Sequence, residues 1–518
     1  MKKQLFRNRK MRYGGMTVIL TVLVITVTVL ANAVFSTLAK RYQWYAYASS
    51  DIDYQVTQRC CDLLDNAFDA VEEDGAAPKV EIMFCDTADN LLAEVSGRYV
   101  YLTASMLAER FPERISVSCH DIWHDPTSVK EYNKTVNPET GEEVETAILS
   151  TSVIIVSGAY SRVYALEEFY VFKEGDTSRL WAYNGEKKLA AGILHAIDPR
   201  ENVVGLLTNH GELFYDYEFL YLLDDAGYSI VYLDLYKDAI PENCHLLISY
   251  NPNADLTHDQ ISAVSEIDIL ESYLSREGNA FLVMADNGTP SLPNFEAFLE
   301  KWGVSFNYAT DLNTGRTYRH MLQDASQSLT SDGYTIYGQA VATGKSAEML
   351  QGLNRNVVFK DSTSIRAAQG YVNNGDGSYT DATTGRVMYS LYQGGTNAVA
   401  WANGNAVADG NGAILMTMTE QAAGNGTSRV GVIASTDFST ESLLQSAVYG
   451  NTDVMMRLLQ GFGKEFVPEG LVIKPFESNT ISIITTAQML FWTIGLSVTP
   501  AVVITAVAVA VLVRRRRA

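Results

Sequence analysis

The hydrophobic positions of the chain form two long uninterrupted runs, one near each end, with a mixed pattern between them. Residues 14–39 contain no charged side chain, and residues 481–513 form a second uncharged run. Each run is longer than the roughly 20 residues that an α-helix needs to cross a bilayer. The pattern therefore predicts one transmembrane helix at each end of a large body.

The first part of the body alternates between helical and strand patterns. An apolar stripe over residues 49–73 is typical of an amphipathic helix, and a second helix is expected to end near residue 111. Short apolar or β-branched runs that are typical of buried strands occupy residues 80–84, 115–118 and 151–156. This order predicts a small α/β domain over residues 45–190.

The second part shows a cleaner alternation and predicts an α/β domain over residues 198–465. Apolar strand segments are expected at residues 203–207, 229–233, 246–249, 280–284 and 429–434. Helical segments are expected at residues 217–226, 262–276 and 451–461. Strands without polar alternation, separated by helices, indicate a parallel sheet covered on both faces. Residues 310–428, richer in Gly, Asn, Ser and Thr, are expected to form an insertion or edge subdomain of loops and short strands.

Charge predicts the orientation of the two spans. The tails at residues 1–13 and 514–518 are basic and contain no acidic residue. By the positive-inside rule both tails are expected in the cytoplasm, with the body outside the cell membrane. The chain carries 39 basic and 60 acidic residues, and without its tails the formal charge is −31. A body of that sign argues against nucleic acid as a partner.

A second interpretation of the first apolar run stays open. The basic residues, the apolar stretch over residues 16–30 and the following Ala31-Asn32-Ala33 are also typical of a cleavable signal peptide. The apolar pattern continues to Leu38, which favours an uncleaved anchor. Both interpretations place the body outside the membrane.

Polar side chains follow the ends of four predicted strands of the parallel sheet. They are Asn209, His210, Glu212, Asn251, Asp286 and Asp437. Ligands of open parallel sheets bind beyond the carboxyl ends of the strands, so these side chains are candidates for one binding crevice. His210 and Glu212 could also act as a base and its partner, or bind a metal. The plainer alternative is that these groups satisfy backbone atoms and cap helices.

No motif predicts a cofactor or a metal. The cysteines are odd in number and lack zinc-ligand spacing: Cys60, Cys61, Cys85, Cys119 and Cys244. The sequence contains no G-x-S-x-G elbow, no H-E-x-x-H motif and no EF-hand loop. We therefore expect no cofactor, no metal and no catalytic set.

An ordered set of segments resembles the GldG-like family of auxiliary components of ABC transporters, first associated with gliding motility. The segments are residues 183–197, 203–212, 222–228, 240–248, 266–274, 429–437 and 450–453. The second segment ends in Thr208-Asn209-His210-Gly211-Glu212, where the family has a Gly-His-Gly-Glu-like turn and Asn209 replaces the first glycine. The resemblance is weak before residue 180 and absent over most of residues 310–428.

The resemblance implies a sheet like that of class I glutamine amidotransferases, without their enzyme chemistry. The turn that matches their catalytic elbow is Tyr250-Asn251-Pro252, which has no cysteine, and Cys244 lies before the strand. By the same analogy the first domain would be thioredoxin-like, although it has no C-x-x-C motif. The implied partners are an ABC permease and a separate ABC ATPase.

Together these features predict a non-enzymatic, membrane-anchored auxiliary subunit of an ABC transporter. Its extracytoplasmic body is expected to bind a ligand, an extracellular polysaccharide or a protein partner. Two alternatives stay open: an anchored extracytoplasmic hydrolase that uses His210, Glu212 and Asp437, or a cell-surface binding protein.

Overall fold

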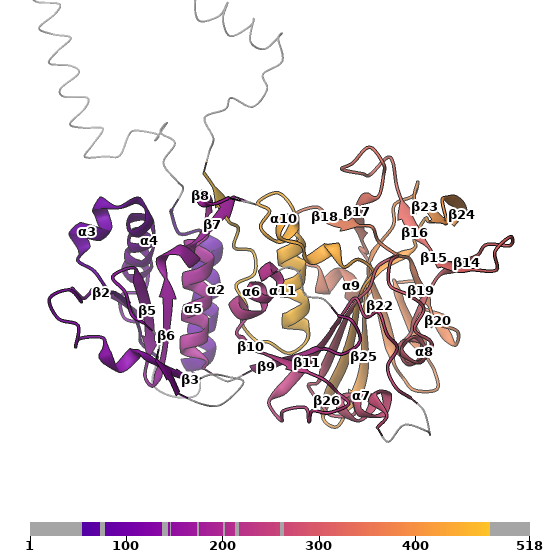
Figure 1. Cartoon of the computed structure of the whole chain (residues 1–518), viewed down its shortest axis with the longest axis horizontal. Coiled ribbons are helices and arrows are strands. Elements are labelled where there is room, and N and C mark those ends of the chain that lie inside the picture. The colour runs from indigo at the N-terminus through magenta and orange to yellow at the C-terminus, as the bar shows by residue number, and fades with distance from the viewer. Residues whose placement is uncertain are drawn as a thin grey trace, which may run out of the picture. The chain divides into compact units, whose positions relative to one another are not determined.

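A computed structural model describes the body of the chain. It covers residues 54–72, 78–136, 143–145, 147–173, 176–199, 202–212, 217–258 and 264–476. Both predicted membrane spans and both basic tails lie outside these residues. Among the helices of the described part, none is long and apolar enough to cross a membrane. Ile52–Phe476 form one compact unit (Figure 1).

The first part of the body contains a four-stranded sheet in the order β2-β1-β5-β6. Its strands are β1 (Val80–Phe84), β2 (Ile115–Cys119), β5 (Ser152–Ser157) and β6 (Tyr160–Ala165). β1 is parallel to β2 and antiparallel to β5. β1 contributes to two hydrophobic clusters, because Ile82 and Phe84 enter one of them and Met83 enters the other.

Helices and short strands complete this first part. They are α2 (Gln58–Glu72), α3 (Ala88–Ala93), α4 (Val95–Arg110), η1 (Lys130–Tyr132), β3 (Lys134–Val136), β4 (Glu143–Glu145), η2 (Leu166–Phe169), β7 (Tyr170–Lys173), β8 (Asp176–Tyr183) and α5 (Gly185–Ile197). The hydroxyl of Thr87 caps α3 by accepting a hydrogen bond from the Asn90 N–H at 3.3 Å. The predicted strands and the end of α4 agree with the structure to within one or two residues.

The main sheet of the body begins with five parallel strands in the order β10-β9-β11-β12-β26. They are β9 (Asn202–Leu207), β10 (Tyr228–Leu233), β11 (Cys244–Tyr250), β12 (Ala280–Met284) and β26 (Gly426–Ile433). Their helices are α6 (Tyr217–Asp225), α7 (Glu266–Leu274), α8 (Pro293–Lys301) and α11 (Asn451–Gly461). The structure therefore establishes a mixed α/β fold with a parallel sheet.

Both faces of this sheet are covered, which explains its continuous apolar strands. Val204 and Leu206 of β9 pack in the same cluster as residues of α6 and α11. Val203 and Leu207 pack in a second cluster with residues of α7 and α8. Successive side chains of a strand point to opposite faces, so a strand between two helix layers has no solvent-facing positions.

Residues 310–428 extend the main sheet and add small sheets beside it. β26 is followed in the sheet by antiparallel strands β25 (Ile414–Ala423), β22 (Val387–Gln393), β17 (Thr335–Ala340) and β18 (Val357–Lys360). The eight-residue pairing of β25 with β26 makes β25 a part of the main sheet and not of a separate insertion. The sequence did not predict β25 as a strand of the main sheet, because Gly-rich and polar segments flank it. Residues 414–419 are nevertheless all buried.

The remaining short elements lie around this extension. They are β13 (Val304–Phe306), β14 (Tyr308–Thr310), β15 (Thr317–Arg319), β16 (Met321–Gln323), α9 (Gly344–Met349), β19 (Ile365–Ala367), β20 (Tyr371–Asn373), β21 (Ser378–Asp381), β23 (Val399–Ala402), β24 (Asn405–Asp409), η3 (Asp437–Ser439), α10 (Glu441–Leu444) and β27 (Lys474–Pro475). Strands β14, β15, β16, β23 and β24 gather at the right of Figure 1. The extended character predicted near the end of the body agrees with β27, which pairs with β8.

Candidate functional site

The order of the parallel strands places a topological switch point between β9 and β11. β9 comes first in the chain and its two neighbours, β10 and β11, follow it on opposite sides. The turns after β9 and β11 therefore flank the crevice where open sheets usually bind ligands. Here the two turns bind each other: the His210 carbonyl accepts hydrogen bonds from the Asn253 and Ala254 N–H groups, at 2.7 and 2.8 Å. Asn209 stands exposed beside them with a φ of 79°.

His210 is buried between two carboxylates. Its Nδ1 lies 3.4 Å from Glu212 Oε1 and its Nε2 lies 3.0 Å from Glu266 Oε1. All three side chains are at least 96% buried. Burial by itself lowers the pKa of His210, but the two carboxylates outweigh it and raise the pKa to about 10. A histidine that is already protonated at neutral pH cannot accept a proton, so this geometry does not suit His210 to act as a general base.

The same carboxylates connect the turn to helix α7. Glu212 Oε2 accepts a hydrogen bond from the His210 N–H at 2.8 Å. Glu266, the first residue of α7, accepts from the N–H and the hydroxyl of Thr257 at 2.8 and 3.0 Å. The His210–Glu212–Glu266 cluster thus connects the turn after β9 to the start of α7, and Glu212 and Glu266 each accept a hydrogen bond from a backbone N–H.

The other candidates form a second group along the same edge of the sheet. Asn251 Oδ1 accepts a hydrogen bond from the Thr289 hydroxyl at 2.7 Å. Asp286 accepts from the Gly288 N–H at 2.7 Å and from the Thr436 hydroxyl. Asp437 pairs with Lys360 at 2.5 Å. The six residues are therefore divided between a closed switch point and a hydrogen-bonded edge.

A cavity that the sequence did not reveal opens beside this edge. It has a volume of about 280 Å³. One wall is the loop after β12, residues 287–291, and the others come from β14, β15, β16 and β23, the turn after β23, and Tyr334 just before β17. Four aromatic side chains contribute to the wall: Tyr308, Tyr318, Tyr334 and Trp401. We refer to it as the Trp401 cavity.

Arg319 organises one side of the Trp401 cavity. Its guanidinium lies 4.0 Å from the centre of the Phe306 ring and donates to the Tyr308 hydroxyl at 2.8 Å. It also pairs with Glu296 at 2.9 Å. The Arg319 Nη1 and the Trp401 Nε1 are buried and have no hydrogen-bond partner. Buried donors without acceptors are uncommon in folded proteins and each calls for an explanation.

Cys244 lies apart from the strand ends described above, and the metal-capable side chains of the described residues are not grouped for metal binding. Cys244 begins β11, at the opposite end of that strand from Asn251, and burial raises the pKa of its thiol to about 11. Within the described ranges, no three His, Cys, Asp or Glu side chains are grouped so as to hold a metal ion.

The chain was compared with known proteins. No family model matches it. No curated protein matches it. Among solved structures, it is similar to the mmIFT52 N-terminal domain, at 14% identity and a TM-score of 0.35 over 50% of this chain and 97% of the other. A similarity to PurLQS from Thermotoga maritima has 12% identity and a TM-score of 0.26, covering 51% of this chain and 99% of the other.

A third solved structure is Agd3, described as a novel carbohydrate deacetylase. The identity is 9% and the TM-score 0.25, over 51% of this chain and 32% of the other. TM-scores of this size do not establish a shared fold. What the structure establishes is the class, a mixed α/β protein with a parallel sheet.

Proposed function

We propose that this protein is a non-enzymatic auxiliary subunit of an ABC transporter, anchored by its two predicted membrane helices. Its body would bind a ligand outside the membrane, and its sheet, related to that of class I glutamine amidotransferases, would act as a scaffold. The observation that supports this proposal is that residues near the start of the body are in direct contact with residues near its end.

Glu186 joins the two ends of the body. Its Oε1 accepts hydrogen bonds from the N–H and the hydroxyl of Thr57, both at 2.6 Å. Its Oε2 lies 2.8 Å from the ammonium of Lys474, which also donates to the Gln55 carbonyl at 2.5 Å. Residues separated by more than 400 positions in the chain are therefore in direct contact. We call this contact the Glu186 junction, made by Gln55, Thr57, Glu186 and Lys474.

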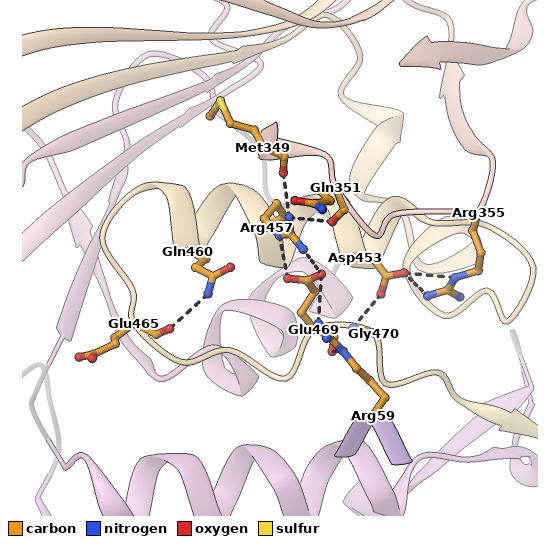
Figure 2. Close-up of polar contacts among 10 residues, drawn as sticks. All are labelled: Arg59, Met349, Gln351, Arg355, Asp453, Arg457, Gln460, Glu465, Glu469 and Gly470. Atoms are coloured by element: carbon orange, nitrogen blue, oxygen red, sulfur yellow. Dashed lines mark hydrogen bonds and ion pairs between the residues drawn. The ribbon is translucent and has the colours of Figure 1, made fainter. Parts of the chain in front are cut away.

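A second set of ion pairs holds the segment that leads to the junction (Figure 2). Arg457 of α11 pairs with both carboxylate oxygens of Glu469, at 2.5 and 2.8 Å. Arg59 of α2 approaches the same carboxylate at 3.5 Å. Asp453 accepts a hydrogen bond from the Gly470 N–H at 3.2 Å. Glu469, near the end of the body, is thus bound both by Arg457 of α11 and by Arg59 of α2, near the start of the body.

This arrangement supports a paired anchor. The described body begins just before Gln55 and ends just after Lys474, and these two residues are in contact. The predicted spans, residues 14–39 and 481–513, would therefore both be tethered to one place on the body. Two membrane helices tethered in this way can pack against each other and against a multi-span permease. The buried, ion-paired environment of His210 argues against acid–base catalysis by this residue.

The test is co-purification of the full-length chain from its native membrane in a mild detergent, followed by mass spectrometry. We expect an ABC permease and its ATPase in near-stoichiometric amounts. The matched control replaces residues 481–513 with an unrelated apolar helix of equal length, which should keep the chain in the membrane but lose both partners. Recovery of the wild-type chain alone, from membranes that contain both transporter proteins, would refute the proposal.

A further inference from the structure

We infer that the Trp401 cavity binds a neutral sugar ring of an extracellular glycan chain. This inference rests on the proposed function and deepens it, because it names the class of ligand that the body takes. Apart from the loop at residues 287–291, the lining of the cavity comes from a part of the chain to which the family resemblance does not extend.

The shape and lining of the cavity fit a sugar ring. At about 280 Å³, it lies near the lower end of the roughly 300–1,000 Å³ that small-molecule pockets occupy. Tyr308, Tyr318, Tyr334 and Trp401 supply flat apolar surfaces with polar tips. A pyranose has the complementary form, with C–H groups on its faces and hydroxyls around its edge.

The unpartnered donors provide the polar part of the fit. Arg319 Nη1 and Trp401 Nε1 are two buried N–H groups in the cavity wall without an acceptor. A rotation of the Trp401 ring on ligand entry would direct its Nε1 at a ring hydroxyl or acetamide oxygen, which is a neutral acceptor. Arg319 is held in place by Tyr308, the Pro290 carbonyl and Glu296, so a ligand would have to approach its Nη1. Leaving such donors unsatisfied is unfavourable, so a ligand that satisfies them gains affinity and orientation.

Charge argues for a neutral ligand over an ionic one. The positive charge of Arg319 is already compensated by Glu296 at 2.9 Å, so it offers little attraction to a carboxylate or phosphate. The negative body repels anions at longer range. Aromatic cages also bind quaternary ammonium groups, but the Arg319 guanidinium already lies 5.7 Å from the centre of the Tyr308 ring, so one of the four aromatic residues already faces a cation.

The rim of the cavity allows the glycan to continue. Gly288, Pro290, Ser291, Thr317, Asn403 and Gly404 all line the cavity and are exposed. A ring held among the aromatic side chains could therefore remain linked to further rings outside. This favours an internal or terminal unit of a polymer over a fully enclosed metabolite.

The test is isothermal titration calorimetry on the full-length chain in lipid nanodiscs. Nanodiscs are used because maltoside detergents carry sugar head groups that would compete with the probes. Cellotetraose and N-acetylchitotetraose are the neutral probes, tetragalacturonate is the anionic probe and choline the cationic one. We expect a neutral tetrasaccharide to bind. Trp401→Ala and Tyr318→Ala should each weaken that binding by about tenfold or more, since each removes an aromatic wall.

Two further variants separate binding from folding. Trp401→Phe keeps an aromatic ring, although a smaller one, and removes Nε1, so we expect a loss of about three- to tenfold in affinity from the lost hydrogen bond and the reduced stacking surface together. Trp123→Ala removes a tryptophan that is 79% exposed in the first part of the body and should leave binding unchanged. Thermal unfolding of each variant checks that it is folded.

The inference is overturned if neither neutral tetrasaccharide binds the wild type, if only tetragalacturonate or choline binds, or if Trp401→Ala and Tyr318→Ala bind as well as the wild type does. The titration uses the purified chain without transporter partners. A failure to co-purify a permease therefore overturns the proposed function and leaves this measurement unaffected.

Discussion

His210 and His195 show how the surroundings of an imidazole decide its charge. His210 lies between two carboxylates, which raise its pKa to about 10 against the effect of burial. His195, on α5, has a pKa lowered to about 4, first by burial and then by the positive charges of Arg162 and Lys464. At neutral pH the first is a buried cation and the second a buried neutral ring.

Removing His210 should destabilise the body strongly. In His210→Ala, Glu212 and Glu266 remain buried without their cation, and we expect a loss of about 3–5 kcal/mol in the free energy of unfolding. Urea unfolding followed by tryptophan fluorescence measures this loss. His258→Ala is the control, because His258 is exposed and its nitrogen lies 3.8 Å from an exposed Asp268 carboxylate. Equal stability of the two variants would contradict the assignment.

The stabilising effect of His210 should also depend on pH. The folded pKa of about 10 lies above the ordinary value of 6.5, so the folded state binds the proton more tightly. The contribution is therefore complete below pH 6.5 and is lost as the pH rises through 10. The difference in unfolding free energy between the wild type and His210→Ala should shrink across that interval. A difference that grows with pH would show that His210 is neutral in the fold.

Helix α5 connects the two sheets of the body through buried charges. All of its residues are buried, including Lys187 and Lys188. The two ammonium groups lie 3.3 and 2.7 Å from the carboxylate of Asp225 at the end of α6. Burial raises the pKa of Asp225, but the lysines outweigh it and lower the pKa. Amphipathic patterning predicts the helix, whereas its complete burial follows from packing between elements that are distant in sequence.

Asp225→Asn should weaken this connection. The substitution keeps the shape of the side chain but removes the nearest countercharge of Lys187 and Lys188. Lys188 keeps Glu168 and Asp224 at 3.9 Å, so we expect a loss of about 1–3 kcal/mol in unfolding free energy. Asp69→Asn, on the exposed face of α2, should change it by less than about 0.5 kcal/mol. Urea unfolding of both variants is the measurement, and similar losses in the two would show that Asp225 does not stabilise this contact.

In the body as a whole, the first described residues contact the last described residues. The Glu186 junction and the Arg457–Glu469 pair hold residues 55–59 beside residues 469–476.

Glu186→Ala should loosen both ends of the body together. The Thr57 amide loses its acceptor and Lys474 loses its ion pair. We expect amide hydrogen exchange in residues 55–60 and 474–476 to become at least about tenfold faster, while α11 and β12 exchange as before. Mass spectrometry on the full-length chain measures this, with the exposed Glu348→Ala as control. Faster exchange at only one end would contradict a shared junction.

Local hydrophobic patterning was sufficient to predict the parallel strands and several helices. Residues 203–207, 280–284 and 451–461 fold as expected because a doubly covered strand or a one-sided helix must carry its pattern in consecutive residues. The order of strand and helix likewise predicts the α/β class. The two apolar runs and the basic tails are also properties of consecutive residues, and they stay predictions because they lie outside the described part.

Only the tertiary structure determines which polar and aromatic side chains become neighbours. Sequence placed His210 at a strand end, but only the fold brings it to Glu266 and closes the crevice. The Trp401 cavity joins residues from 287 to 404, whose spacing carries no common period. A periodic pattern reports which side of an element faces the core. It does not report which distant elements become neighbours, because non-local pairing depends on packing free energy summed over the whole body.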